Sequence, residues 1–217
     1  ASSQRLFTGS GSPPTFTAPA DSNLGLKPNS GSSEYVLTDT VDNIHYALND
    51  FTVTPSYHRG KLKEISSRQW NSQGKAGLEY SYDSYGQITQ IMTAEGQDYS
   101  IVFTYNNWVV TKVQVKDGTT VLEQAEYTYY GDVTSPSTDL GSSGDLVQVK
   151  VSRDASNDTP GTLSIVRYTQ YRYDANSRLK AVYDHDAIQR IIASEAGISS
   201  PADILSEDAA YGTPDPP

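Results

Sequence analysis

The sequence contains no cysteine and relatively few positively charged residues. Without cysteine, neither a disulfide framework nor a thiolate metal site can form, and the redox compartment stays open. Lys and Arg number 16 against 26 Asp and Glu, which gives a net charge of -10. Nucleic acids and anionic membranes are bound by basic surfaces, so this balance argues against both as partners.

Long apolar runs and targeting features are also missing. No run is long enough to span a bilayer, so we expect no membrane insertion. No basic start precedes an apolar stretch, as it would in a signal peptide. The chain begins with Ala1 rather than Met, and we therefore expect a mature product or an excised piece whose targeting signal lies elsewhere.

What the chain does have is tyrosine, with 16 residues against four Phe and two Trp. This bias suits half-buried strand surfaces, where a ring packs and its hydroxyl reaches water. The segment 1–33 differs, because it is rich in Ser, Gly and Pro and shows no period. Such a segment predicts an extended arm that becomes ordered only against another element. Its anchors would be Leu6, Phe7, Phe16, Leu24 and Leu26.

The segment 34–183 consists of short runs in which apolar and polar residues alternate, as in strands. The runs are 34–38, 44–48, 62–65, 78–82, 87–91, 99–105, 109–116, 121–130, 146–151, 163–173 and 178–182. Turn signals separate them: Arg59-Gly60, Asp83-Ser84-Tyr85-Gly86, Glu95-Gly96, Asn106-Asn107, Asp117-Gly118 and Asp174-Ala175-Asn176-Ser177. The pattern predicts a mainly β domain of consecutive antiparallel hairpins.

The segment 184–210 has a different period and predicts two short helices. The first has isoleucines at helical spacing and a terminating glycine: Ile188, Ile191, Ile192 and Gly197. The second would begin with Ser200 as N-cap and Pro201 at the first helical position. A Pro-rich tail, 211–217, follows.

A repeated unit is visible when the strands are aligned on their second tyrosine. The copies are YSYDSYGQITQI (80–91), FTYNNWVVTKV (103–113), YTYYGD (127–132) resuming at GDLVQVKV (144–151), and YRYDANSRLKAV (171–182). The second tyrosines of the first three copies are 23 and 24 residues apart, and the fourth follows 44 residues later, close to two units. The motif positions are Tyr80, Tyr82, Asp83, Gly86, Ile88, Ile91, Phe103, Tyr105, Tyr127, Tyr129, Tyr171, Tyr173, Asp174, Leu179 and Val182.

The pattern Tyr-x-Tyr-Asp-x-x-Gly-x-Leu/Ile-x-x-Val/Ile resembles the YD repeat of RHS-repeat proteins. That group includes bacterial polymorphic toxins, insecticidal toxin-complex components and the teneurins. The copy 80–91 matches best, whereas Ser177 stands in the glycine position of the fourth copy and Asn106 and Tyr130 in the aspartate position of the others. The resemblance implies a curved or spiralling sheet that forms part of a hollow shell, for which this chain has too few hairpins.

The motif also has a reading from its residues alone. Tyrosines at i and i+2 share one face of a strand, where each ring would pack on its equivalent in the next hairpin. The aspartate would accept N–H bonds within the turn, and the glycine would supply positive φ. The aliphatic residues of the return strand would fill the same face. A single hairpin is marginal in water, so neighbouring hairpins must stabilise one another.

Residues for catalysis are not arranged in any recognisable pattern, and we predict a non-enzymatic protein without metal or cofactor. The sequence Asp184-His185-Asp186 fits either a metal site or, in our preferred interpretation, a helix start, where acids favour the dipole. The stretch 154–158 has oxygen ligands but lacks the calcium-loop glycine, so a solvated turn is preferred.

Three functional hypotheses follow. The first is a structural YD-repeat module, a fragment or subunit of a larger bacterial cell-surface or secreted assembly, with other chains or further repeats as partners. The second is a carbohydrate- or surface-recognition module in which Trp70 and Trp108 stack on sugars. The third is part of a toxin-encapsulating shell.

Overall fold

A computed structural model describes residues 8–10, 15–17, 23–29, 33–50, 55–67, 77–93, 99–131, 141–154, 161–174 and 176–206. The chain forms two compact units. Unit 1 comprises Ala1–Phe103 with Lys116–Thr119, and unit 2 comprises Thr104–Val115 with Thr120–Pro217.

The strands occupy most of the described chain. They are β1 (Thr8–Ser10), β2 (Thr15–Thr17), β3 (Leu24–Pro28), β4 (Glu34–Asp39), β5 (Ile44–Asn49), β6 (Leu62–Ser67), β7 (Leu78–Tyr82), β8 (Ile88–Thr93), β9 (Tyr99–Asn106), β10 (Val109–Asp117), β11 (Thr120–Tyr129), β12 (Leu146–Asp154), β13 (Leu163–Tyr173) and β14 (Leu179–Tyr183). The helices are η1 (Ser56–His58), α2 (His185–Ser194) and α3 (Pro201–Ser206).

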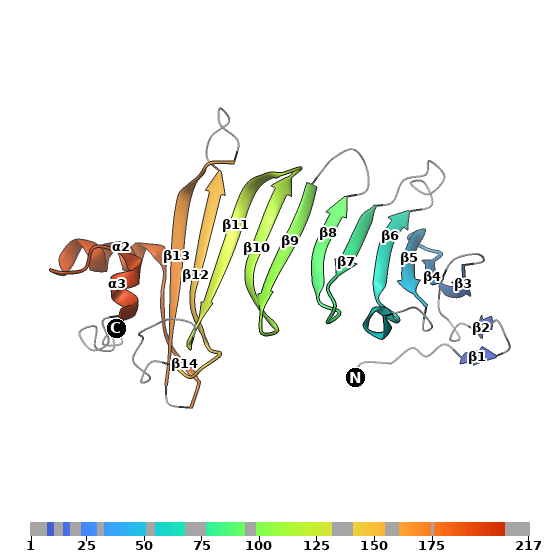
Figure 1. The fold of residues 1–217 in the computed structure, drawn as a ribbon, viewed down its shortest axis with the longest axis horizontal. Coiled ribbons are helices and arrows are strands. Elements are labelled where there is room, and N and C mark those ends of the chain that lie inside the picture. The colour runs from blue at the N-terminus through green and yellow to red at the C-terminus, as the bar shows by residue number, and fades with distance from the viewer. Residues whose placement is uncertain are drawn as a thin grey trace. The chain divides into compact units, whose positions relative to one another are not determined.

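In unit 1, the strands β3 to β8 and the start of β9 lie side by side in chain order, each antiparallel to the next (Figure 1). The segment predicted as an extended arm contributes β3, which pairs with β4 along its whole length. It also contributes the separate β1–β2 hairpin, whose Phe16 ring packs edge-on against Tyr35 of β4 at 5.3 Å. Part of the arm is therefore ordered by lying against the sheet.

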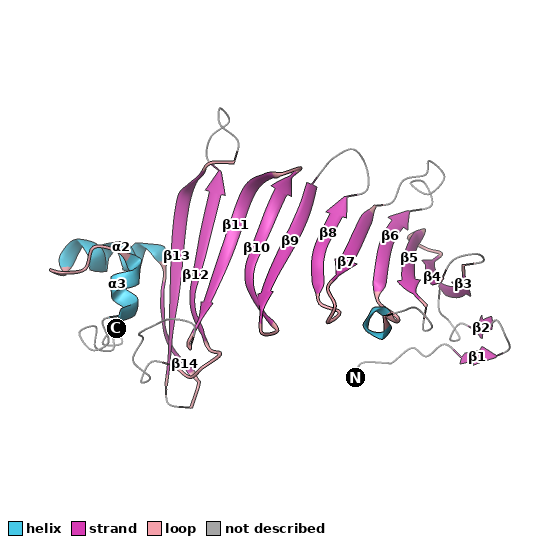
Figure 2. Cartoon of the chain, in the orientation of Figure 1, coloured by secondary structure: helices cyan, strands magenta, loops and turns pink. Residues whose placement is uncertain are grey.

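In unit 2, β10 to β14 are again neighbours in chain order, and the paired strands β11 to β14 are antiparallel. The two helices follow β14, and α2 packs against β13 and β14 (Figure 2). The prediction of a mainly β chain of consecutive antiparallel hairpins with short C-terminal helices is confirmed. The turn signal Glu95-Gly96 and the stretch 155–158 lie outside the described residues.

Few apolar side chains are fully buried, because the strands of each unit form a single layer. Among the described residues they are Tyr130, Val147, Ile188, Ile198 and Ile204, all in unit 2. Most other strand residues are half-buried. The only buried cluster that joins several elements lies beneath the helices, where Ile188, Ile198 and Ile204 meet Tyr168 and Tyr183, among the residues that the structure describes.

A polar contact holds α3 on β13. The Gln170 amide, fully buried, donates to the Pro201 carbonyl at 2.8 Å and to Gln148 Oε1 at 3.0 Å. Arg172, 6% exposed, donates to the Ile204 carbonyl at 3.2 Å and lies over the Tyr183 ring. The Ile204 carbonyl lies in the last turn of α3, where unpaired carbonyls carry partial negative charge, so it suits the Arg172 guanidinium.

The helix starts follow the predicted capping residues. Asp184 caps α2, because its carboxylate accepts the Ala187 N–H at 2.8 Å, which confirms the helix-start interpretation of Asp184-His185-Asp186. Ser200 precedes α3, and its hydroxyl accepts the Asp203 N–H at 3.4 Å. Asp203 in turn accepts from the N–H groups of Ser199 and Ser200, and these bonds, foremost that of Ser199, lower the pKa of its carboxyl. No helix among the described residues has the length and apolarity to cross a membrane.

We predict that Ile188→Ala lowers the free energy of unfolding of unit 2 by about 2–4 kcal/mol, since a fully buried isoleucine is removed from the cluster beneath the helices. Leu179→Ala is the control, because Leu179 is 57% exposed and its truncation is expected to cost less than about 0.5 kcal/mol. Urea titration, monitored by circular dichroism, measures the free energy of unfolding of both variants. Equal losses would contradict the assignment of this cluster as the core of unit 2.

Candidate functional site

Three of the four predicted copies have the same pairing register. In each hairpin the first tyrosine lies opposite the last aliphatic residue of the motif. The second tyrosine lies opposite the first aliphatic residue. One residue of the return strand has no partner, which is a β-bulge. The pairs are Tyr80 with Ile91 and Tyr82 with Ile88, Tyr127 with Val149 and Tyr129 with Leu146, and Tyr171 with Val182 and Tyr173 with Leu179.

The bulge explains why the motif places its two aliphatic residues three positions apart. On a regular strand, residues separated by three point to opposite faces. The unpaired residue between Ile88 and Ile91 shifts the register by one, so that both oppose tyrosines on one face. We call this face, in each unit, the tyrosine face.

A further hairpin with this register, which the repeat alignment missed, is β5–β6. Tyr46 pairs with Ile65 and Leu48 pairs with Leu62, with the same shift between them. Leu48 replaces the second tyrosine, and a long turn containing η1 separates the strands. The signal that remained in the sequence is the spacing Gly60-x-Leu62-x-x-Ile65, the second half of the motif.

The same pair of backbone hydrogen bonds closes all four turns. The residue in the aspartate position donates its N–H to the carbonyl that precedes the return strand, and the residue in the glycine position donates to the carbonyl of the aspartate position. The bonds are Asn49 to Lys61 and Gly60 to Asn49, Asp83 to Gln87 and Gly86 to Asp83, Tyr130 to Asp145 and Gly144 to Tyr130, and Asp174 to Arg178 and Ser177 to Asp174, at 2.8–3.1 Å.

Two turns have the predicted aspartate bonds. Asp83 Oδ1 accepts the N–H groups of Tyr85 and Gln87 at 2.8 and 2.9 Å, and Asp174 Oδ1 accepts those of Asn176 and Arg178 at 2.9 and 3.0 Å. The Arg178 guanidinium also binds the Asp174 carboxylate at 2.7 Å. This side-chain bond, with the two backbone N–H bonds, lowers the pKa of Asp174 to about 2.

Positive φ occurs at the glycine position of every one of these turns. The angles are +67° at Gly60, +78° at Gly86, +94° at Gly144 and +55° at Ser177. Ser177 therefore adopts the left-handed conformation that the motif assigns to glycine, at an energetic cost for an L-residue. At Gly86 a side chain is also sterically excluded, since a Cβ would lie 2.9 Å from the Tyr57 carbonyl oxygen.

The second tyrosine of a hairpin binds the backbone where an earlier strand begins. The Tyr82 hydroxyl donates to the Leu62 carbonyl at 2.5 Å, and the Tyr129 hydroxyl donates to the Val110 carbonyl at 2.8 Å. Burial raises the pKa of Tyr173, and the backbone of Leu146 opposes this rise. Burial raises the pKa of Tyr82, with a smaller contribution from Tyr80. The hairpins β7–β8 and β11–β12 are thereby joined to the return strand of the hairpin before them.

This geometry corrects the predicted stacking of equivalent rings at Tyr82 and Tyr173. The ring of Tyr173 packs edge-on against Tyr130 at 6.2 Å, and that of Tyr82 is tilted against His58 at 6.0 Å. Equivalent tyrosines belong to strands two positions apart, about 10 Å in the sheet, which is too far for ring contact. A hydroxyl at the end of the ring does reach the intervening strand.

Tyr130 replaces the motif aspartate and closes its turn by packing. Its ring is 4% exposed, and its hydroxyl donates to the Tyr171 carbonyl at 3.3 Å. Gly141 lies against this ring so closely that a Cβ would be 2.4 Å from it. Gly141, which follows the polar insertion, therefore packs against the ring, a contact for which the sequence offers no local signal.

The β9–β10 hairpin, the remaining copy, differs from the others. Phe103 and Tyr105 are two residues apart in β9 and half-buried, as predicted. The turn is the dipeptide Asn107-Trp108, with φ of +46° and +75°, the type I′ geometry that prefers Asn-Gly. Trp108 is 67% exposed at the tip of this turn. Trp70 lies outside the described residues.

The last hairpin leaves its aliphatic residues uncovered. Leu179 is 57% exposed and Val182 is 50% exposed, although both oppose tyrosines of β13. The expectation that they fill a packed face is not met here, because β14 has no further strand beside it among the described residues. The equivalent motif positions of β8, Ile88 and Ile91, are half-buried, because the next strand lies beside them.

Metal-binding groupings are not found among the residues that the structure describes. Among the described residues, no group of three or more His, Asp or Glu side chains converges on a point where a metal ion would bind. His185 lies next to two aspartates, but its ring stacks on Tyr168 and its Nδ1 accepts a backbone N–H. A scan against known protein families finds no match, and a search of curated proteins finds no relative.

We predict that Tyr82→Phe lowers the free energy of unfolding of unit 1 by about 1 kcal/mol, since the Leu62 carbonyl loses its donor. Tyr80→Phe is the matched control on the same strand, because no hydrogen bond of its hydroxyl to a described residue is present. Thermal unfolding of the two variants measures the difference. Equal stability would contradict the role of the second tyrosine as the link between hairpins.

We predict that Arg178→Gln raises the pKa of Asp174 from about 2 toward the ordinary value of 3.8. A carboxyl with a lowered folded-state pKa contributes stability above its unfolded-state pKa and loses it as pH falls through the folded-state value. The wild-type turn should therefore lose this contribution between about pH 4 and pH 2. Carboxyl-carbon NMR titration checks the shift, and an unchanged pKa in the variant would contradict the assigned cause.

Proposed function

We propose that this chain is a structural YD-repeat module that acts as a scaffold or enclosure within a larger assembly at a bacterial cell surface or in the secreted state. The observation that carries the proposal is the recurrence of one register, one bulge and one pair of closing bonds in four hairpins. A repeat built this way serves to extend a sheet, since each copy is stabilised by its neighbours.

The tyrosine face of unit 1 supports a role in association. Cross-strand partners share a face, and apolar residues occupy one face from β3 to the start of β9. They are Leu26, Tyr35, Leu37, Tyr46, Leu48, Leu62, Ile65, Leu78, Tyr80, Tyr82, Ile88, Ile91 and Ile101. None of these is fully buried. A half-buried apolar face of this extent is typical of a surface that other protein covers.

The resemblance to RHS-repeat proteins is what supports the bacterial, extracytoplasmic placement. The resemblance rests on Tyr82-Asp83 with Gly86 and on Tyr173-Asp174. The missed copy that ends in Gly60-x-Leu62-x-x-Ile65 adds to it. Other protein chains or further repeats of the same polypeptide are accordingly the partners that we propose.

The proposal predicts that the chain associates as its concentration rises, and that Ile101→Lys reduces this association. Ile101 lies on the tyrosine face opposite Ile91 and is 37% exposed, so a lysine there is tolerated by the fold but not by a covering partner. The control is Gln90→Lys, on the adjacent position of β8 and hence the opposite face. Sedimentation velocity over a range of concentrations measures the association of the wild-type chain and of both variants. A wild-type chain that stays monomeric, or equal effects of the two lysines, would contradict the proposal.

A second candidate function, recognition of carbohydrate, is favoured by Trp108. A bulky residue at φ of +75° costs stability where glycine would be relaxed, and such strain is often retained at binding sites. The ring is two-thirds exposed, as a stacking platform for a sugar must be.

For this candidate we predict that Trp108→Gly raises the unfolding temperature and removes binding on a glycan array. Asn-Gly is the preferred type I′ dipeptide, and we expect a gain of about 0.5–1 kcal/mol. Trp108→Ala is the control, with the unfolding temperature nearly unchanged and binding lost. A lower unfolding temperature for the glycine variant would mean that the ring is a packing element.

A further inference from the structure

The edge of β13 that faces away from β12 is only partly covered. β12 pairs with β13 from Leu163 to Gln170, whereas β14 pairs with it only from Gln170 to Tyr173. After Tyr183 the chain leaves the sheet at Asp184 and enters α2. Within the described part of the chain, no strand lies beside the stretch of β13 before Gln170 on this side.

One hydrogen bond fixes the direction of the backbone groups along this edge. The Tyr168 N–H donates to His185 Nδ1 at 3.4 Å and so points away from β12. In an antiparallel strand alternate residues direct both backbone groups to the same side. The Val166 N–H and carbonyl and the Tyr168 carbonyl therefore point outward too, and no hydrogen bond joins them to another described residue.

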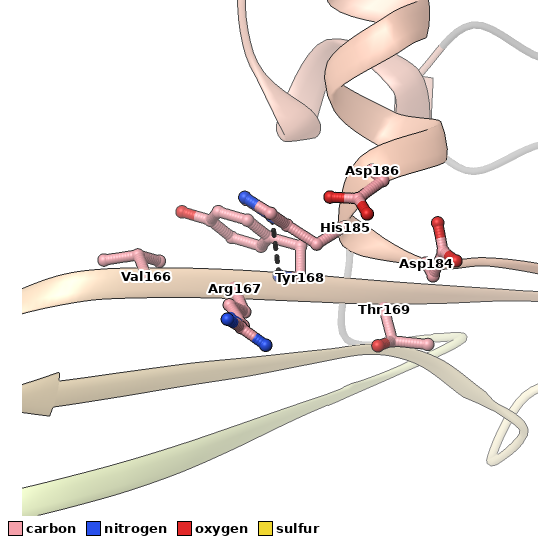
Figure 3. A pocket seen from close by; sticks show the side chains of 7 residues that line it. All are labelled: Val166, Arg167, Tyr168, Thr169, Asp184, His185 and Asp186. Carbon is pink, nitrogen blue, oxygen red and sulfur yellow. Dashed lines mark hydrogen bonds between the residues drawn. The ribbon is translucent and has the colours of Figure 1, made fainter.

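A cavity of about 540 Å³ lies along this edge (Figure 3). It is lined by Val166, Arg167, Tyr168, Thr169, Asp184, His185 and Asp186. Asp184 and Asp186 lie together where α2 begins, and Arg167 projects from the opposite side of the β13 ribbon, further along the strand. The cavity thus has unpaired backbone groups along one wall, carboxylates at one end and a guanidinium toward the other.

We propose that this edge binds a short extended peptide, which adds as an antiparallel strand to β13 with its amino-terminal end at Asp184 and Asp186. Only an extended backbone offers the alternating donors and acceptors that the Val166 N–H, the Val166 carbonyl and the Tyr168 carbonyl require. The antiparallel direction continues the line of β14, which runs from Tyr173 toward Gln170.

Charge complementarity selects this direction over the parallel one. An antiparallel peptide places its positively charged amino terminus at the two carboxylates and its carbonyl end toward Arg167. A parallel peptide would bring its carboxyl-terminal end to Asp184 and Asp186, which is repulsive. The site lies on an edge rather than on the tyrosine face, so it goes beyond the scaffold role and does not depend on it.

The test uses short peptides of alternating valine and threonine with a dye at the carboxyl end. We expect the peptide with a free amino terminus to bind, as measured by fluorescence anisotropy, and its acetylated form to bind more weakly. N-methylation of every second peptide amide should abolish binding when the methylated amides are the ones that face β13. Methylation of the intervening amides should leave binding unchanged, because these amides face away from β13. Absence of binding, or equal effects of the two methylated sets, would overturn the proposal.

Variants of the protein test the end of the site that the carboxylates form. Asp184→Asn/Asp186→Asn should weaken the free-amine peptide about two- to tenfold and leave the acetylated one little changed. Asparagine caps helices as well as aspartate does, so α2 is retained. The control is Asp42→Asn/Asp117→Asn, which removes two exposed charges outside the site. A similar loss in the control pair would overturn the assigned direction.

Hydrogen exchange locates the peptide independently of affinity. Saturating peptide should slow the exchange of the Val166 amide, because that N–H would then donate to the added strand. The Arg167 amide, which points to β12, serves as the internal control and should not change. Binding without slower exchange at Val166 would show that the peptide sits elsewhere and would overturn the proposal.

Discussion

The alternation of a β-strand conflicts with the spacing of the return-strand aliphatic residues, and the whole repeat depends on how that conflict is resolved. Residues three apart, such as Leu62 and Ile65 or Ile88 and Ile91, fall on opposite faces of a regular strand. A single unpaired residue in each return strand brings them to one face, opposite the paired tyrosines. The bulge thus creates the tyrosine face, and the turn bonds place it at the same position in the hairpins β5–β6, β7–β8, β11–β12 and β13–β14.

The hairpins are then connected through backbone and hydroxyl groups more than through a buried core. A hydroxyl at the tip of a ring reaches one strand back, as Tyr82 reaches Leu62, and this reach matches the spacing of neighbouring strands. In unit 2, Tyr130 is buried against Gly141, and Ile188 of α2 is buried in the cluster beneath the helices.

The helices illustrate how a polar contact can specify a docking position. Arg172 is buried, and the groups that accept from it are the carbonyls of Tyr171 and Ile204 and the Gln170 side chain. A buried guanidinium is costly unless its donors are satisfied, so α3 has one favourable place on β13. The side chain presents these donors on the face opposite the tyrosines, and the described helices of unit 2 pack on that face.

Strands, helix caps and most turns could be predicted because each depends on neighbouring residues. Alternation located the hairpins, and Asp83 with Gly86 identified the closing turn. The hairpin of Tyr46 and Leu62 was predicted as a pair of strands, but its place in the repeat was missed because a long turn divides its motif. The contacts of Tyr130 with Gly141 and of Arg172 with Ile204 join residues far apart in sequence, so no local pattern reveals them. The open edge of β13 depends on where β14 ends, which the alternation of Leu179 to Val182 did not delimit.

The paired turn bonds are the same whether few or many residues lie between them. Two residues separate Asp83 from Gly86, whereas 13 separate Tyr130 from Gly144, and the strands on either side keep one register. Loop closure becomes only slowly more costly with length, by about 0.6 kcal/mol for each doubling. The interior of this turn is therefore a position at which additional polypeptide, even a folded domain, can be accommodated without displacing the sheet.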